Sequence, residues 1–315
     1  MTIGRYIPDQ AAQPAILGEQ YGTTQMGADS ATGTFAGRRA PLTTEPKWKR
    51  RIGILGGLGP FAHLEFEHLL LQAASHRFGR EILDQEYPAW ILVSLPQIPD
   101  RTAALLANGS SPVPLLLEGF RLLRESDFCV ITCNTAHIFI DEIRKQINQP
   151  ILDIVSETIR HVTSFSHGNS PIGLIGTTAT LRLGLYQRRS KILKSTIQFV
   201  TPLDFSEEGK TGEIIQKQHV MDLIYGSQDD AEDPLKGGIK AGAHRHRMIH
   251  DEMQRRFRKL LKWFEDAGIN TVVLACTELA LICGRRELGS VSLIDPLEIA
   301  ASAAIEIAAG ERPLP

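Results

Sequence analysis

The stretch Val130-Ile-Thr-Cys-Asn-Thr-Ala-His137 has an apolar run that ends in a cysteine, followed by polar residues that suit the start of a helix. The stretch Val273-Leu-Ala-Cys-Thr-Glu-Leu-Ala280 repeats this arrangement, with Cys276 lying 143 residues after Cys133. A short continuous apolar run predicts a strand that is buried on both faces, as in parallel sheets. A thiol at such a junction lies beside a helix N-terminus, where unpaired amides favour the thiolate. Two such thiols in one chain predict an acid and a base that face a single substrate carbon.

Apolar runs of this kind alternate with amphipathic helical stretches along the chain. The expected strands are Ile52–Leu55, Trp90–Val93, Cys129–Thr132, Ile151–Asp153, Ile172–Ile175, Ile197–Val200, Thr271–Ala275 and Leu293–Asp295. The expected helices include Phe61–Arg77, Pro112–Arg124, Ile249–Asp266 and Pro296–Ala309. Helices between short apolar runs are typical of α/β proteins with parallel sheets and crossover connections. The sequence therefore predicts an α/β fold.

Two further echoes indicate an internal duplication. Arg51-Ile-Gly-Ile-Leu-Gly56 resembles Pro171-Ile-Gly-Leu-Ile-Gly176, and Ile151-Leu-Asp153 resembles Leu293-Ile-Asp295. The order matches in both halves, which predicts two similar α/β domains related by pseudo-twofold symmetry, with an insertion around residues 226–242. The alternative to a duplication is that the ends of unrelated strands resemble one another by chance. Ligands of open α/β folds bind at the carboxyl ends of the strands, so the cleft between the domains would receive one thiol from each side.

Composition limits the classes of function. The chain has 315 residues, 43% hydrophobic and 22% charged, with a net charge of −2. This balance gives no reason to expect a nucleic acid or membrane partner. Apolar runs are too short to span a bilayer. Four cysteines do not form the framework of a small secreted protein, so a cytoplasmic location is expected. Residues 1–50 lack sustained periodicity and predict a flexible arm, or an arm that packs on a partner subunit.

Six short motifs together resemble the cofactor-independent aspartate/glutamate racemase superfamily, and more closely its aspartate racemase branch. They are Ile52-Gly-Ile-Leu-Gly-Gly-Leu-Gly-Pro60, Pro96-Gln-Ile-Pro-Asp-Arg-Thr102, Cys133-Asn-Thr-Ala-His137, Gly238-Ile-Lys-Ala-Gly242, Cys276-Thr-Glu278 and Leu293-Ile-Asp-Pro296. The resemblance covers about residues 51–310. It implies a first domain of residues 51–153 plus the C-terminal helix 296–315, and a second domain of residues 154–295. It also implies a homodimer and no cofactor.

The resemblance implies amino-acid racemisation, with aspartate as the first expected substrate and glutamate or other amino acids as alternatives. Cys133 and Cys276 are the expected bases on opposite faces of Cα, one abstracting the proton while the other donates. A decarboxylase or isomerase of the same superfamily that uses one thiol, and a binding protein without turnover, are the other classes considered.

The other expected site residues bind substrate or support a thiol. Asn134, Thr135 and Thr277 follow the cysteines, where side chains and amides suit a carboxylate, or cap helices. Arg101 and Lys240 match family positions that contact substrate carboxylates, although Lys236 competes with Lys240 for this assignment. Glu278 is expected to orient Cys276 or its helix, and it replaces the histidine typical of the glutamate racemase branch.

The glycines after the first strand allow close backbone approach, and Gly57 and Gly59 are expected to border the substrate. The same segment imitates a dinucleotide fingerprint, but the next strand ends without the acidic residue that such a site needs. The pair His244 and His246 lacks a carboxylate or cysteine partner at metal-binding spacing, so no metal is expected. Cys129 and Cys283 are interpreted as core thiols.

Overall fold

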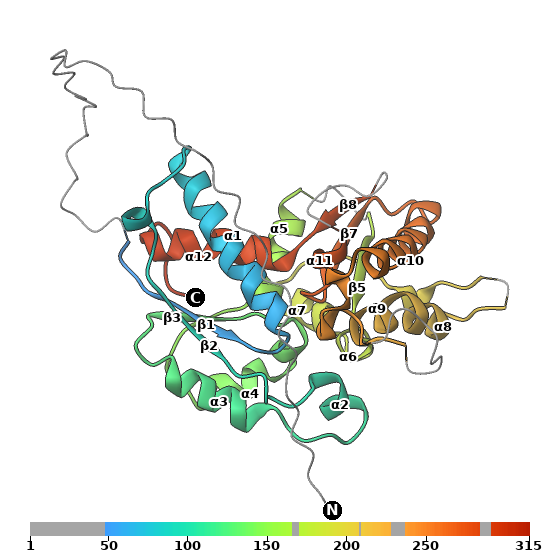
Figure 1. Cartoon of the computed structure of the whole chain (residues 1–315), viewed down its shortest axis with the longest axis horizontal. Coiled ribbons are helices and arrows are strands. Elements are labelled where there is room, and N and C mark those ends of the chain that lie inside the picture. Colours follow the sequence, from blue (N-terminus) through green and yellow to red (C-terminus); the bar gives the residue numbers. More distant parts are fainter. Residues whose placement is uncertain (1–47, 166–169, 208, 228–236, 284–290) are drawn as a thin grey trace, which may run out of the picture. The chain divides into compact units, whose positions relative to one another are not determined.

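The computed structural model describes residues 48–165, 170–207, 209–227, 237–283 and 291–315 (Figure 1). Most of the expected arm, and also Lys236, lies outside the described residues. Of residues 1–50, only the last three are described. The backbone amides of Lys49 and Arg50 donate to the carbonyl of Ala308, and the Arg50 guanidinium donates to the carbonyls of Ile307 and Arg312. The chain therefore enters the first strand along the C-terminal helix.

The first sheet contains four parallel strands in the order β2-β1-β3-β4. These are β1 (Ile52–Gly56), β2 (Trp90–Ser94), β3 (Phe128–Ile131) and β4 (Ile151–Leu152). Ile52 lies opposite both Trp90 and Phe128. All residues of β1, β3 and β4 are buried, as the continuous apolar runs predict.

The second sheet repeats this topology with the order β6-β5-β7-β8, also fully parallel. Its strands are β5 (Ile172–Gly176), β6 (Phe199–Val200), β7 (Thr271–Ala275) and β8 (Ser292–Ile294). In both sheets the strand that precedes a site cysteine, β3 or β7, lies beside the first strand of its half. The predicted class, two parallel-sheet α/β units, is confirmed. The exact domain boundaries stay a prediction.

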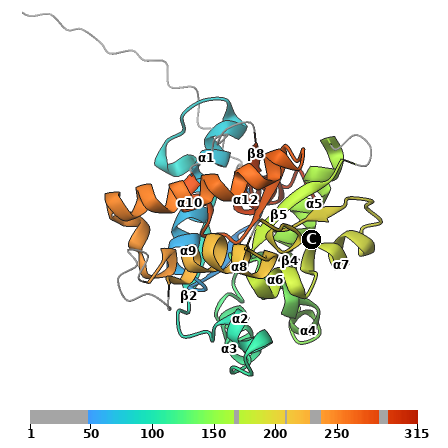
Figure 2. The same cartoon turned by 90° about the vertical axis from the view of Figure 1, so that its right-hand side faces the viewer.

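Helices connect the strands in both halves (Figures 1 and 2). In the first half they are α1 (Pro60–Phe78), α2 (Arg101–Leu106), α3 (Val113–Leu122) and α4 (Ile140–Arg144). The others are α5 (Ile154–Phe165), α6 (Thr178–Arg182), α7 (Leu185–Ile192), α8 (Gly212–Gln216), α9 (Asp222–Tyr225), α10 (Arg247–Asp266), α11 (Ala280–Cys283) and α12 (Pro296–Ala309). Short 3₁₀ turns and one π turn, Lys217–Met221, lie between them. Helix α12 packs against both α1 and α5.

The expected strands that end in aspartate stop one residue early for a common reason. Asp153 accepts hydrogen bonds from the amides of Val155 and Ser156, and Asp295 accepts one from the amide of Leu297. Each carboxylate therefore satisfies amides at the start of the following helix instead of continuing the strand.

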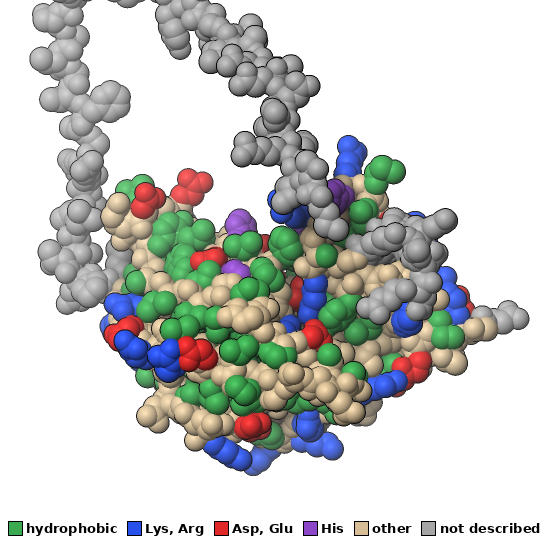
Figure 3. All heavy atoms as spheres, turned by 60° about the horizontal axis from the view of Figure 1, so that its bottom comes forward, with side chains coloured by type: hydrophobic (Ala, Val, Ile, Leu, Met, Phe, Trp, Pro, Cys, Tyr) green, Lys and Arg blue, Asp and Glu red, His purple; other side chains and the backbone are tan. Residues whose placement is uncertain are grey.

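The surface shows no single-signed face in the view of Figure 3, where acidic and basic side chains are mixed among hydrophobic ones. No helix within the described ranges is long and apolar enough to cross a membrane.

Candidate active site

A small cavity is lined by both predicted thiols. Cys133 reaches it from the loop after β3, and Cys276 directly follows β7, so the two equivalent strands each supply one cysteine. Both are nearly enclosed, with 6% and 5% of their surfaces exposed. A larger groove between α5 and α12 contains neither thiol. The enclosed cavity is therefore the candidate site.

Most of the predicted site residues come together here. The lining consists of Leu58, Arg101, Cys133, Asn134, Thr135, Thr177, Tyr225, Lys240, Cys276, Thr277 and Glu278. Gly57 and Gly59 are not among these lining residues. The first has φ +89° and packs against the backbone of Leu95, and the second has φ +155° and lies against the Glu278 carboxylate. Their conformations shape the loop between β1 and α1, which places Leu58 at the cavity.

Glu278 holds the second thiol. Its Oε2 accepts hydrogen bonds from Cys276 Sγ at 3.1 Å and from the Thr277 hydroxyl at 3.1 Å, while its other oxygen, Oε1, is buried without a hydrogen-bond partner. Burial and the neighbouring Glu278 carboxylate raise the pKa of Cys276 well above its usual value, although Lys240 opposes them. The Cys276 thiol is consequently held in its protonated form.

Arg101 approaches the site from the start of α2. Its two terminal nitrogens donate to the carbonyls of Pro99 and Leu58, and its Nε is buried without a hydrogen-bond partner. Burial opposes the charged form, but the charges of Cys133 and Asp100 outweigh it and raise the pKa of Arg101. A guanidinium fork that clamps a carboxylate was expected. The structure instead leaves Nε as the nitrogen without a partner.

Asn134 is fixed by a residue of the other half of the chain. The hydroxyl of the fully buried Tyr186 donates to Asn134 Oδ1 at 2.7 Å, and Asn134 Nδ2 is buried without a partner. The alternative of simple helix capping is wrong for Asn134, because its side chain makes no cap hydrogen bond to the 3₁₀ turn Thr135–Phe139 that follows. The turn is too tight to start a regular α-helix directly after the cysteine.

Hydroxyl groups join the two halves beside the cavity. Thr135, Thr177 and Thr180 form a triangle in which their hydroxyl oxygens lie 3.0 to 3.1 Å apart. The Thr277 hydroxyl also lies 3.3 Å from the carbonyl of Thr132. Thr135 and Thr277 are therefore part of the contact between the halves as well as of the cavity lining.

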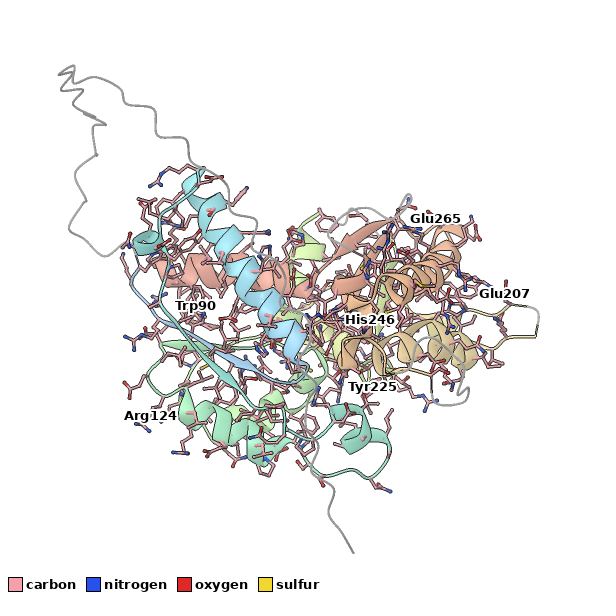
Figure 4. All side chains as sticks on the ribbon, in the orientation of Figure 1. Trp90, Arg124, Glu207, Tyr225, His246 and Glu265 are labelled. Atoms are coloured by element: carbon pink, nitrogen blue, oxygen red, sulfur yellow. The ribbon has the colours of Figure 1, made fainter. Side chains whose placement is uncertain are left out.

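Lys240 belongs to a network that sequence reasoning missed in part. Its Nζ lies 3.2 Å from Asp100 Oδ2 and 3.3 Å from the Tyr225 hydroxyl, and 4.4 Å above the Tyr225 ring. Tyr225, at the end of α9, faces the start of α2, where its hydroxyl donates to Asp100 at 2.9 Å (Figure 4). Burial lowers the affinity of Lys240 for its proton, but Glu278 and Tyr225 outweigh this effect and raise its pKa.

The other candidates stand outside this chemistry. Cys129 and Cys283 are buried thiols in the hydrophobic clusters, as expected. His244 packs edge-on against Phe61, with ring centres 5.0 Å apart. The part of the chain that the structure describes contains no group of three metal-ligating side chains. His137, which follows Cys133, contacts the carbonyl of that cysteine through Nδ1 at 2.8 Å and helps to fix its loop.

Comparisons with known proteins find similarity to racemases over part of the chain. A family model described as Asp/Glu/Hydantoin racemase matches residues 55–206. The broad specificity amino-acid racemase RacX of Bacillus subtilis (strain 168) is 29% identical over 157 residues, which cover 49% of this chain and 64% of the relative. The glutamate racemase of Aquifex pyrophilus is 31% identical over 120 residues, which cover 35% of this chain and 46% of the relative.

A solved structure supports the likeness in fold. The aspartate racemase of Picrophilus torridus superposes with a TM-score of 0.61 at 22% identity, covering 83% of this chain and 95% of that chain. The matches to the two curated relatives thus span less than two thirds of their lengths, whereas the structural match spans nearly the whole neighbour.

Proposed function

We propose that the chain is an amino-acid racemase of the kind described by the Asp/Glu/hydantoin racemase model, which matches residues 55–206, and that its two bases are Cys133 and Cys276. The observation that carries this proposal is the meeting of these two thiols, one from each half of the chain, in one enclosed cavity. Racemisation needs a proton to leave one face of Cα and another to arrive on the opposite face, which two separate groups achieve without moving.

The surroundings of the thiols distinguish their starting roles. Cys276 donates to Glu278 and is held as a thiol, whereas Cys133 lies within the field of the Arg101 guanidinium. In the proposed reaction the Cys133 thiolate takes the Cα proton and becomes a thiol. The Cys276 thiol then delivers its proton to the other face of the carbanion and becomes the thiolate. For the opposite enantiomer, the roles are exchanged.

The developing negative charge needs hydrogen-bond donors that are already in position. Two buried nitrogens beside the thiols have no hydrogen-bond partner, namely Arg101 Nε and Asn134 Nδ2. Tyr186 orients the Asn134 amide so that its nitrogen, rather than its oxygen, is left for this purpose. These donors would stabilise the enediolate on the α-carboxylate, and the mechanism uses side chains of this chain alone.

Aspartate is the substrate that we propose first, with glutamate or a broader set of amino acids as alternatives. Two cations, Arg101 and Lys240, line a small cavity, which suits a short substrate with two carboxylates. The relatives divide on this point, because one is named an aspartate racemase, another a glutamate racemase and a third a broad-specificity racemase. The homodimer and the cytoplasmic location stay predictions.

Exchange of the Cα proton in deuterated water tests the function. We expect the purified chain to exchange this proton and lose optical activity with both enantiomers of at least one amino acid in a panel. Replacing either Cys133 or Cys276 by Ser should abolish racemisation, whereas Cys129→Ala, which removes a buried core thiol, should leave it within about twofold. A folded wild-type protein that exchanges no amino acid of the panel would contradict the proposal.

A further inference from the structure

We propose that Asp100 determines the selectivity of this site between substrates with acidic and with neutral side chains, because it competes with a substrate carboxylate for Lys240. The inference rests on the proposed function and deepens it, because it assigns a role to a residue that does not line the cavity. It starts from the pairing of the cavity cation with a carboxylate of the protein itself.

Both oxygens of Asp100 are engaged. Oδ1 accepts the amide of Ala103 at 2.9 Å and caps α2, while Oδ2 receives the Lys240 ammonium at 3.2 Å and the Tyr225 hydroxyl at 2.9 Å. Asp100 stands at the rim, with 33% of its side chain exposed against 21% for Lys240. Asp100 thus holds Lys240 from the solvent side, while Lys240 itself lines the cavity.

The cations of the site already face carboxylates of the protein. Two cations, Arg101 and Lys240, face two carboxylates, Asp100 and Glu278, and the terminal nitrogens of Arg101 already donate to backbone carbonyls. A substrate with a neutral side chain brings a single carboxylate, for which Arg101 Nε and Asn134 Nδ2 are available. A second substrate carboxylate needs Lys240 as its partner. To reach Lys240 it must displace the Asp100 carboxylate or share the ammonium with it. The pair therefore lowers the preference for acidic substrates.

Tyr225 keeps Lys240 in place when this exchange occurs. The ammonium lies over the Tyr225 ring and within hydrogen-bond distance of its hydroxyl, so two of its contacts do not depend on Asp100. Replacing Asp100 by Asn should consequently free the cation without displacing it. Asparagine caps helices as well as aspartate does, so α2 should keep its start.

Calorimetric titration of the full chain with succinate, which has two carboxylates, and with butyrate, which has one, tests the inference. For Asp100→Asn we expect succinate to bind about fivefold more tightly, which is the order of effect for a partly exposed ion pair, with butyrate unchanged. In a Lys240→Met background the same Asp100 replacement should no longer affect succinate. A succinate affinity that does not rise, or that rises equally without Lys240, would overturn the inference.

Racemisation separates this inference from the proposed function. If the wild type racemises an amino acid, the proposed function stands, and the Asp100→Asn protein should then show a lower KM for aspartate but not for alanine, by about the same fivefold. If the wild type racemises nothing, the proposed function fails, while the succinate titration still decides whether Asp100 competes for Lys240.

Discussion

Gly59 gives the sharpest test of how the loop after β1 supports the second thiol. This residue precedes α1 with φ 155° and ψ 116°, a conformation that side chains of L-residues rarely adopt. A Cβ added there would lie against Glu278 Oε1, closer than the 3.0 Å that real Cβ atoms keep. The other oxygen of the same carboxylate holds the Cys276 thiol. Gly59→Ala should therefore push Glu278 away from Cys276.

The size of the effect follows from two contributions. Forcing alanine into this backbone conformation costs about 1 to 3 kcal/mol, and losing a hydrogen bond to a charged group costs about 1.5 to 3 kcal/mol. Together they give an expected loss of about 2.5 to 6 kcal/mol in the free energy of unfolding. Gly79→Ala is the matched control, because Gly79 ends the same helix with φ 62° and nothing within 4 Å of its Cβ position. It should lose only about 1 kcal/mol.

Urea denaturation measures both losses, and alkylation of Cys276 in a background without Cys133 reports the position of Glu278. Gly59→Ala should also reduce Cα-proton exchange by at least about tenfold, whereas Gly79→Ala should leave exchange unchanged. Equal stability losses in the two variants, together with unchanged alkylation of Cys276, would refute the reasoning.

Three further predictions concern charge. Burial and the Glu278 carboxylate raise the pKa of Cys276, so Glu278→Gln should lower the pKa of this thiol. The pH dependence of Cys276 alkylation measures the change, and an unchanged profile would contradict the prediction. Arg189 Nε pairs with Asp153 at 3.2 Å in the interior. Arg189→Met should therefore lower the free energy of unfolding, measured by urea denaturation, by about 3 kcal/mol, whereas the same replacement of an exposed arginine should lower it less. Burial alone would raise the pKa of Asp100, but its basic neighbours and hydrogen bonds lower it overall. Its charge thus stabilises the fold fully above its ordinary pKa of about 4, and this contribution is lost as the pH falls from there through the lowered pKa of the folded state. The decline in Tm over that range should be shallower for Asp100→Asn, and equal slopes would count against this.

The fold was predictable because its signals are local. Each buried parallel strand reads as a continuous apolar run, and a polar residue such as Asp153 or Asp295 marks its end by capping the next helix. The thiols were predictable for the same reason, since Cys133 and Cys276 lie at the ends of equivalent strands. Because the pattern occurs twice, it also led to the expectation that these two distant cysteines share one cavity, which a single motif could not have given.

The network around Lys240 could not be predicted in this way. Tyr225, at the end of α9, meets Asp100, which caps α2, across 125 residues of sequence, and neither residue has a local signature for this contact. The same holds for Tyr186, whose hydroxyl fixes Asn134 from 52 residues away. These contacts depend on how the second half of the chain folds back onto the first, which periodicity does not encode.

The polar contacts between the halves differ in how easily a substrate can separate them. At one side of the cavity the hydroxyls of Thr135, Thr177 and Thr180 bond to one another while almost fully buried. Breaking these bonds without replacement would leave buried polar groups unpaired, at about 1 to 3 kcal/mol each.

At the rim, Lys240 and Asp100 are partly exposed, so water replaces a lost contact at little cost. The cavity should therefore admit substrate from the Lys240 side, because that side loses least on opening and regains a carboxylate partner from the substrate. The residue that we propose to set specificity thus also stands where the substrate would enter.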